Sequence, residues 1–446
     1  MYHRLKFAAC AAAAAVLTGC TSLSLSVDNL LAAPKLTDEQ TEIHEALIDS
    51  VGSNITLKYP RNGDNRSAFV VADIDDEDTD EAIVFYEYSG TDGSEDGLRV
   101  NLLDRNEDGE WYSVKEVAGA GTEIDKVILT KVSGIKGTCV LVGYQTLTGD
   151  EKTLEIYSYK DGELQRIGSD NYSLLETIDL NSDGANELVS VRKTTNPETG
   201  LVSAKASLLE LKDGEITAGQ STEMCDNVAS YLRARAAKVS GGRSALYVDS
   251  INADGNMQTE IIYYRYSALQ NPMQLRSEKL LPLCTRPSGY YSVDIDGDGL
   301  IEIPSTRVML GYESALPEEQ VLSTSWSIYV DFYELEVKYS GYYSVPDGYA
   351  MMFPARWSDM VTVKKDSATG EAVFYKYEGD INAEMTELMR IAVEAKPDSQ
   401  DYIYDGYQVI KSIGQLDYLV KLPTDRREQL ILTIDEVENN FYVVPT

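Results

Sequence analysis

The sequence predicts a mainly β protein, in which a β-propeller-like array of about five to seven four-stranded blades is followed by a small α+β sandwich domain. Strand-like runs flank an acidic turn at Asp73, Asp179 and Asp294. Related segments recur about every 45 to 70 residues, which is enough chain for one small sheet per repeat. Further strand-like runs turn at Asp-Gly pairs, as hairpins do. Since one such sheet cannot bury both faces alone, the sheets are expected to pack around an axis.

The chain begins like an exported protein. Arg4 and Lys6 precede an alanine-rich apolar run that is shorter than the about 20 residues of a membrane-spanning helix. The run leads into residues 17–20 (LTGC), which resemble the lipobox of bacterial lipoproteins. The resemblance implies cleavage before Cys20 and a diacylglycerol on its sulfur, whose two acyl chains give a stable membrane anchor. The alternative is an ordinary signal peptide in which the cysteine stands by chance.

Four regions are expected along the chain. They are a lipoprotein signal peptide at 1–19, a tether at 20–36, an N-terminal helix with the propeller-like array at 37–345, and the α+β domain at 346–446. Thr37 is expected to cap the helix, with Gln40 completing a capping box. In the last region, strand-like runs alternate with a polar helix-like stretch at 383–394.

Charge and composition exclude several function classes. The formal net charge is -34, so the surface repels nucleic acid and suits an extracellular setting or cation binding. The chain has only two histidines, and His3 lies in the expected signal peptide. The histidine content therefore argues against a Ser-His-Asp triad or a multi-histidine metal centre. The cysteines that follow Cys20 form no CxxC pair, and they are expected to be small buried residues, of which two can form one disulfide.

The acidic loops carry the hard oxygen ligands that calcium prefers, at alternating positions of a tight turn. The best set is Asp294, Asp296, Asp298, the carbonyl of Leu300, and Glu302. The second set is Asp179, Asn181, Asp183 and Glu187, and the third is Asp73, Asp75, Glu77 and Glu81. A structural calcium ion is expected at the best loop. The alternative is a set of solvated acidic hairpins, because Asp, Asn and Gly favour turns without any metal.

Two resemblances to known families follow from these motifs. The strand, the Asp-x-Asp-Gly-Asp-Gly loop at 294–299 and the next strand resemble the FG-GAP or VCBS repeats of integrin-α-like β-propellers. Gly348-Tyr349, Phe353-Pro354 and Trp357 are similar to the opening of the PsbP-like α+β sandwich at the end of some bacterial lipoproteins. That resemblance implies a partner-binding domain without a shared catalytic set. The alternative for Phe353 and Trp357 is simple core packing.

The expected function is that of a non-enzymatic binding or scaffold lipoprotein on the extracytoplasmic face of the cell membrane. Its partners would be the membrane, through the lipid on Cys20, and an extracellular protein or glycan, but no nucleic acid. Assistance to the folding or assembly of another exported protein is a special case of this prediction. The alternative is an extracellular carbohydrate-active enzyme on a propeller, with paired carboxylates as acid and base.

Overall fold

The computed structural model describes residues 36–90, 97–147, 151–275, 277–331, 334–396 and 406–444. The protein is mainly β, as predicted. Cys20, the signal peptide and almost all of the tether lie outside the described residues, so the lipid anchor stays a prediction. Among the helices that are described, none combines the length and the apolar character needed to cross a membrane.

The predicted N-terminal helix is present as α3 (Asp38–Val51). The Thr37 hydroxyl accepts the N–H of Gln40, and the Gln40 side chain accepts the N–H of Thr37, which is the expected capping box. Ile43 and Leu47 are buried one turn apart, and they pack the helix against the first sheet. That sheet contains β1 (Ile55–Leu57), β2 (Phe69–Ala72), β3 (Glu81–Tyr88), β4 (Leu98–Arg105) and β5 (Trp111–Ala118).

The second sheet has eight strands and consists of two antiparallel four-stranded units. The first unit is β6 (Glu123–Thr130), β7 (Cys139–Gln145), β8 (Lys152–Lys160) and β9 (Glu163–Tyr172). The second unit is β10 (Leu174–Ile178), β11 (Glu187–Thr195), β12 (Val202–Lys212) and β13 (Glu215–Glu223). The units meet where β13 runs parallel to β9, with Ile216 opposite Gly168. A Cβ at Gly168 would lie 2.9 Å from the Ile216 carbonyl, so this contact requires glycine.

The third sheet includes a short helical segment between two of its strands. The sheet contains β14 (Val228–Lys238), β15 (Ser244–Asn252), β16 (Met257–Arg265), β17 (Ala268–Gln270) and β18 (Thr285–Arg286). The helices α4 (Pro272–Leu275) and α5 (Ser277–Cys284) connect β17 to β18. Cys139, Cys225 and Cys284 are all buried and free, so the expected burial is confirmed and no pair of them forms a disulfide.

The last two sheets share one hydrophobic core. The fourth contains β19 (Ile303–Val308), β20 (Leu322–Val330), β21 (Glu334–Ser344), β22 (Tyr349–Met352) and β28 (Phe441–Val443). The fifth contains β23 (Val361–Lys365), β24 (Ala372–Lys376), β25 (Glu387–Ala395), β26 (Gln408–Ile413) and β27 (Leu416–Lys421), and α6 (Ile434–Asn440) precedes β28. Because β21 pairs with β22, the boundary expected between 345 and 346 falls inside the fourth sheet. The PsbP-like resemblance stays a prediction.

The prediction of a helix at 383–394 is wrong, because most of this segment belongs to strand β25. Polar residues with good helix propensity suggested the helix. In the fold, however, this segment pairs with β24 on one side and β27 on the other. Buried residues in the strand include Leu388, Met389 and Ile391, so both faces of the sheet are covered at this place. Tertiary pairing outweighs a local preference of a few tenths of a kcal/mol per residue, about the size of the helix propensity scale.

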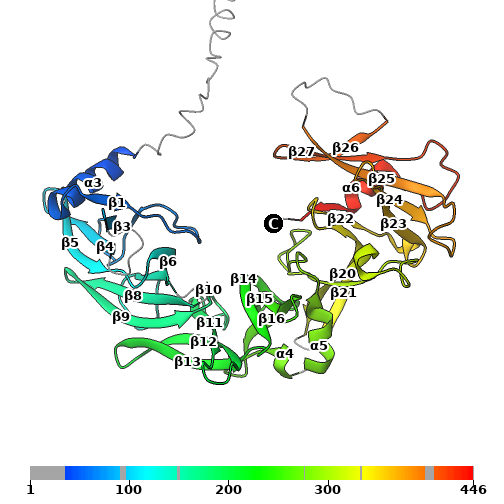
Figure 1. Cartoon of the computed structure of the whole chain (residues 1–446). Helices are drawn as coiled ribbons and strands as arrows, with labels where there is room; N and C mark the ends of the chain where they lie inside the picture. The colour runs from blue at the N-terminus through cyan, green and yellow to red at the C-terminus, as the bar shows by residue number, and fades with distance from the viewer. Residues whose placement is uncertain are drawn as a thin grey trace, which may run out of the picture.

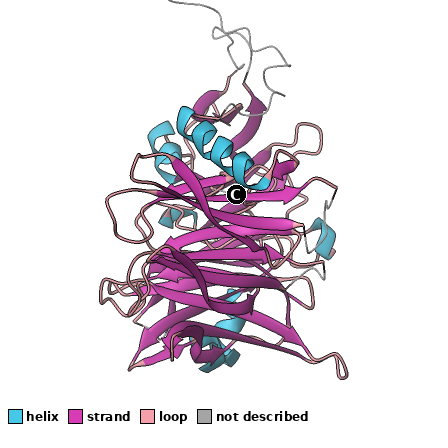
Figure 2. Ribbon diagram, turned by 90° about the vertical axis from the view of Figure 1, so that its left-hand side faces the viewer, coloured by secondary structure: helices cyan, strands magenta, loops and turns pink. Residues whose placement is uncertain are grey.

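The five sheets follow one another in chain order along an arc (Figure 1). After a quarter turn of the molecule, their strands lie layered one over another (Figure 2). No described strand of the first sheet pairs with a strand of the fifth, and Figure 1 shows these two sheets on either side of an opening. The arc is therefore not closed by strand pairing within the described part of the chain.

A buried ion pair ties the third sheet to the segment that leads into the fourth. Arg286 in β18 has a side chain with 0% exposure, and its Nη2 lies 3.0 Å from Asp249 Oδ1 in β15. The same guanidinium donates to Thr259 Oγ1 at 2.6 Å and to the Tyr290 carbonyl at 2.7 Å. Asp249 Oδ2 also accepts the N–H of Ser292 at 3.0 Å. This network fixes the entry into the acidic loop that begins at residue 294.

Candidate functional site

Three acidic loops contain clustered carboxylates. One joins β2 to β3, one joins β10 to β11, and one follows the bridged residue Val293 and precedes β19. In each loop, carboxylate oxygens of three acids lie within 4.8 Å of one another. The groups are Asp73, Asp75 and Glu81; Asp179, Asp183 and Glu187; and Asp294, Asp296 and Glu302. Since hard cations take clustered carboxylate oxygens as ligands, such groups can hold a metal ion.

The backbone orients these acids in the same way in all three loops. The N–H groups of Ile74, Leu180 and Ile295 donate to Oε2 of Glu81, Glu187 and Glu302, each at 2.8 Å. The first aspartate of each loop accepts, on Oδ1, the N–H of the residue three positions later at 2.7 to 2.8 Å. These hydrogen bonds set the carboxylates without using all of their oxygen lone pairs.

The loop at 179–187 brings together all four residues of the second predicted set. Nδ2 of Asn181 donates to Asp183 Oδ2 at 3.0 Å and to Glu187 Oε1 at 2.6 Å. Burial raises the pKa of Glu187, and the charges of Asp183 and Asp179 raise it further. Within the described ranges, no lysine or arginine forms an ion pair with any of these three acids. The side chains of Asn181, Asp183 and Glu187 border a cavity of 380 Å³, through which a cation can reach the group.

The loop at 73–81 brings together three of its four predicted residues. Asp73, Asp75 and Glu81 form the group, whereas Glu77 lies outside it and donates its N–H to Asp75 Oδ1 at 3.1 Å. Burial raises the pKa of Glu81 to about 7, and the charge of Asp75 adds to this shift. Burial and then the charge of Glu77 raise the pKa of Asp75. A divalent cation would relieve the charge repulsion that adds to the effect of burial in both shifts.

The loop at 294–302, the best match in the sequence, contains an ammonium group of the chain itself. Lys338 Nζ lies 2.7 Å from Asp296 Oδ2, 2.7 Å from Asp298 Oδ2 and 2.9 Å from Glu302 Oε1. The backbone of Leu300 donates its N–H to Asp298 Oδ1 at 2.9 Å. The carboxylates of this loop therefore lie close together, as predicted. They do not fit a metal ion as ligands while the ammonium group of Lys338 lies among them. No local motif marks Lys338, because its place in the loop follows only from the packing of β21.

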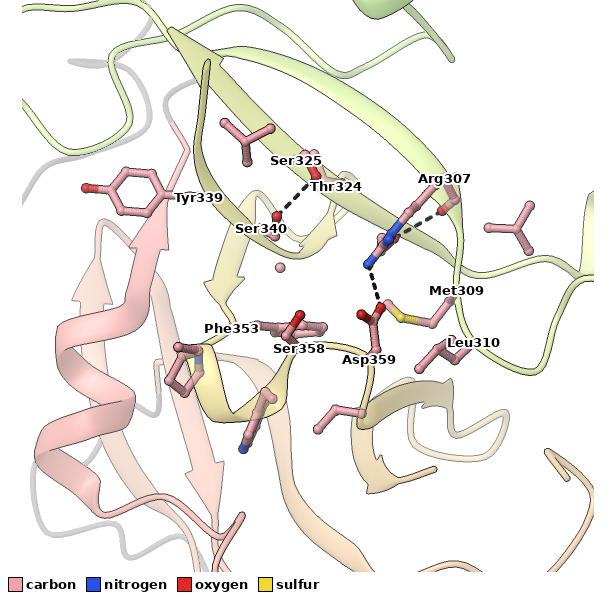
Figure 3. Close-up of a pocket in the computed structure, with 18 of the residues that line it drawn as sticks. Arg307, Met309, Leu310, Thr324, Ser325, Tyr339, Ser340, Phe353, Ser358 and Asp359 are labelled. Atoms are coloured by element: carbon pink, nitrogen blue, oxygen red, sulfur yellow. Dashed lines mark hydrogen bonds and ion pairs between the residues drawn. The ribbon is translucent and has the colours of Figure 1, made fainter. Parts of the chain in front are cut away.

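A larger cavity of 550 Å³ lies between β19–β21 and the segment 353–361. Arg307 and Asp359 lie 3.5 Å apart across it, and Ser325 and Ser340 exchange a hydrogen bond at 3.1 Å along one wall (Figure 3). The sequence did not single out these residues. Trp357, which also lines the cavity, is fully buried, as the core-packing interpretation predicted.

Comparison with known proteins found likenesses in structure and none in sequence. No family model matches the chain, and no curated protein matches it. The structure of the Pseudomonas aeruginosa periplasmic gluconolactonase is similar at a TM-score of 0.28 and 13% identity, over 74% of this chain and 85% of that chain. The crystal structure of an exotype rhamnogalacturonan lyase is similar at a TM-score of 0.28 and 11% identity, over 75% of this chain and 73% of that chain.

These comparisons correct one prediction. The sequence analysis expected a protein that is not an enzyme, and this is contradicted because the two structures described above, among those similar to this chain, are of enzymes. Neither activity is transferred to this chain at a TM-score of 0.28. An enzymatic role therefore has to be judged on the side chains of this protein alone.

Proposed function

We propose that this chain is a calcium-stabilised protein of β-propeller type, related to the FG-GAP or VCBS repeats, that a lipid on Cys20 anchors to the extracytoplasmic face of the membrane. The observation that supports calcium binding most directly is the repeated loop geometry, in which three acids converge and the backbone orients the last one by a 2.8 Å hydrogen bond. The groups at Asp73 and Asp179 are the sites. A partner at the cell surface would be an extracellular protein or a glycan.

The role of the ion in this proposal is structural. Calcium supplies positive charge among carboxylates that otherwise repel one another. Asp179, Asp183 and Glu187 would hold it between β10 and β11, and Asp73, Asp75 and Glu81 would hold it between β2 and β3. In both loops these residues join two strands of one sheet, so an ion bound there would limit local opening of the hairpin.

Calcium is expected to raise the melting temperature of the purified protein. At a concentration about 100 times the dissociation constant, one site contributes about 2.7 kcal/mol of stability. For sites of the extracellular kind, with dissociation constants of about 10⁻⁴ to 10⁻³ M, this requires 10 mM calcium or more. The double substitution Asp179→Ala and Asp183→Ala removes two ligands of one site, so we expect thermal melting and calorimetry to show one ion fewer and a smaller shift.

The matched control for this experiment is Asp108→Ala. Asp108 is an exposed acid of the turn between β4 and β5, and it belongs to none of the three groups. It should leave the calcium response unchanged. A parent protein whose melting temperature does not respond to 10 mM calcium would contradict the proposal and identify the loops as solvated hairpins.

A second candidate function is action on a carbohydrate in the 550 Å³ cavity. Its lining combines two carboxylates, Asp359 and Glu313, with the hydroxyl groups of serines and with the aromatic rings of Tyr339 and Phe353. Such a combination suits a polyhydroxylated ligand, and a glycosidase needs two carboxyl groups as its acid and base.

The carbohydrate candidate predicts that the parent protein releases reducing sugar from some member of a panel of neutral and acidic polysaccharides. We expect Asp359→Asn to lower this rate by at least about 10²-fold, since loss of a general acid or base costs about that much. Ser173→Ala, far from the cavity in sequence and absent from its lining, is the control. Equal rates in parent and Asp359→Asn, or no release from any polysaccharide, would remove this candidate.

A further inference from the structure

We infer that the ammonium group of Lys338 is the resident cation of the loop at 294–302, so that this loop takes no calcium although its sequence matches the calcium motif best. The inference deepens the proposed function, because it says which of the three acidic loops takes no calcium.

The contacts of Lys338 use the whole donor capacity of its ammonium group. A lysine ammonium has three N–H donors, and Nζ lies within 2.9 Å of one oxygen each from Asp296, Asp298 and Glu302. The Glu302 side chain has 0% exposure, so its charge needs a partner inside the protein. Lys338 provides that partner. Asp296 and Glu302 belong to the group of three clustered acids in this loop, so the ammonium group competes with a metal ion for two members of that group.

A neighbouring residue strengthens this arrangement. The Tyr339 hydroxyl donates to Asp296 Oδ2 at 2.6 Å, which is the same oxygen that Lys338 contacts. Burial alone would raise the pKa of Asp296, but the hydrogen bonds from Lys338 and Tyr339 bring it below its ordinary value. Calcium would have to displace a lysine whose side chain is only 19% exposed and whose ammonium group has three charged partners in this loop. The displaced lysine would lose all three ion pairs.

The other two loops have no such cation in the described part of the chain. Asp179, Asp183 and Glu187 form no ion pair with lysine or arginine there. In the loop at 73–81, Lys131 pairs with Asp76 at 2.7 Å, but Asp76 does not belong to the group of three, and the Lys131 side chain is 70% exposed. Among the three acidic loops, the one at 294–302 is therefore the loop in which a lysine ammonium group lies among the clustered acids of the described chain.

The test is the number of calcium ions bound per chain, measured by calorimetric titration with calcium chloride on the parent and on Lys338→Met. Methionine keeps most of the side-chain volume and removes the charge. We expect the variant to bind one ion more than the parent, and its melting temperature to rise more with calcium. Lys131→Met is the matched control, because it removes an ammonium from an acidic loop without uncovering a group of three acids, and it should bind as many ions as the parent.

The outcomes separate this inference from the proposed function. A parent that binds two ions and a Lys338→Met variant that binds three would support both. If the parent binds none and the variant binds one, the inference stands and the proposed function fails. A parent that binds three ions, or a folded variant that gains none, overturns the inference.

A second measurement decides the question if Lys338→Met does not fold without calcium. Folding of the variant on addition of calcium supports the inference, because calcium then replaces the missing ammonium. If the variant fails to fold even with calcium, Asp294→Asn in the parent background decides. An unchanged number of bound ions supports the inference, whereas the loss of one ion, as expected for Asp179→Asn, overturns it.

Discussion

Replacement of Arg286 by methionine is expected to lower the free energy of unfolding by about 3 to 5 kcal/mol, the usual cost of breaking a buried ion pair from one side. Arg286 is fully buried and donates to Asp249, Thr259 and Ser292 as well as to two backbone carbonyl groups. Methionine leaves the Asp249 carboxylate, whose side chain is 3% exposed, with Arg233 at 3.3 Å as its one remaining charged partner among the described residues. Denaturant unfolding of parent and variant measures the difference.

The control for this prediction is Arg307→Met. Arg307 also pairs with an aspartate, Asp359, but both side chains are about 70% exposed. Solvent screens such a pair, so the expected loss is below about 1 kcal/mol. Combining Arg286→Met with Asp249→Asn should cost less than the sum of the two single changes, because the unpaired charge disappears. If Arg286→Met and Arg307→Met lowered the free energy of unfolding equally, burial of the ion pair could not be the reason for the large expected loss.

Replacement of Trp357 by alanine is expected to cost about 3 to 5 kcal/mol, as large core truncations do. Trp357 has 0% exposure and lies in the core shared by the last two sheets. Its ring packs against Phe353 and Phe374, and its Nε1 donates to the Leu430 carbonyl at 2.7 Å. Alanine leaves a void and an unpaired carbonyl group, and it also removes one wall of the 550 Å³ cavity.

Thermal and denaturant unfolding test this expectation against Leu201→Ala. Leu201 is 70% exposed, so its truncation should stay within about 0.5 kcal/mol. Because the core joins the fourth and fifth sheets, Trp357→Ala should shift a single transition for both of them. A variant in which only the fifth sheet melts early, seen by hydrogen exchange at β23–β27, would contradict this account and favour an independent C-terminal domain.

Local patterns were sufficient for much of the fold. The capping box at Thr37 and Gln40 predicted the start of α3, because both hydrogen bonds form between residues close in sequence. Strand-like runs on both sides of the turns at Asp73 and Asp179 predicted paired strands, and β2–β3 and β10–β11 are present there. The prediction was wrong at β25, where the partners that cover the strand come from distant segments.

The sequence by itself determined the three acidic loops, since their acids lie within nine residues of one another and the turn brings them together. Only the tertiary structure decided which charges neutralise them. Lys338 reaches the loop at 294–302 from β21, across a fold in which β19 and β20 are paired with each other and β20 with β21. Only the tertiary structure decided, too, that β21 pairs with β22, so that the fourth sheet includes strands from both sides of the expected domain boundary. Contacts of this kind join residues that are far apart in the chain, so no periodicity or local motif records them.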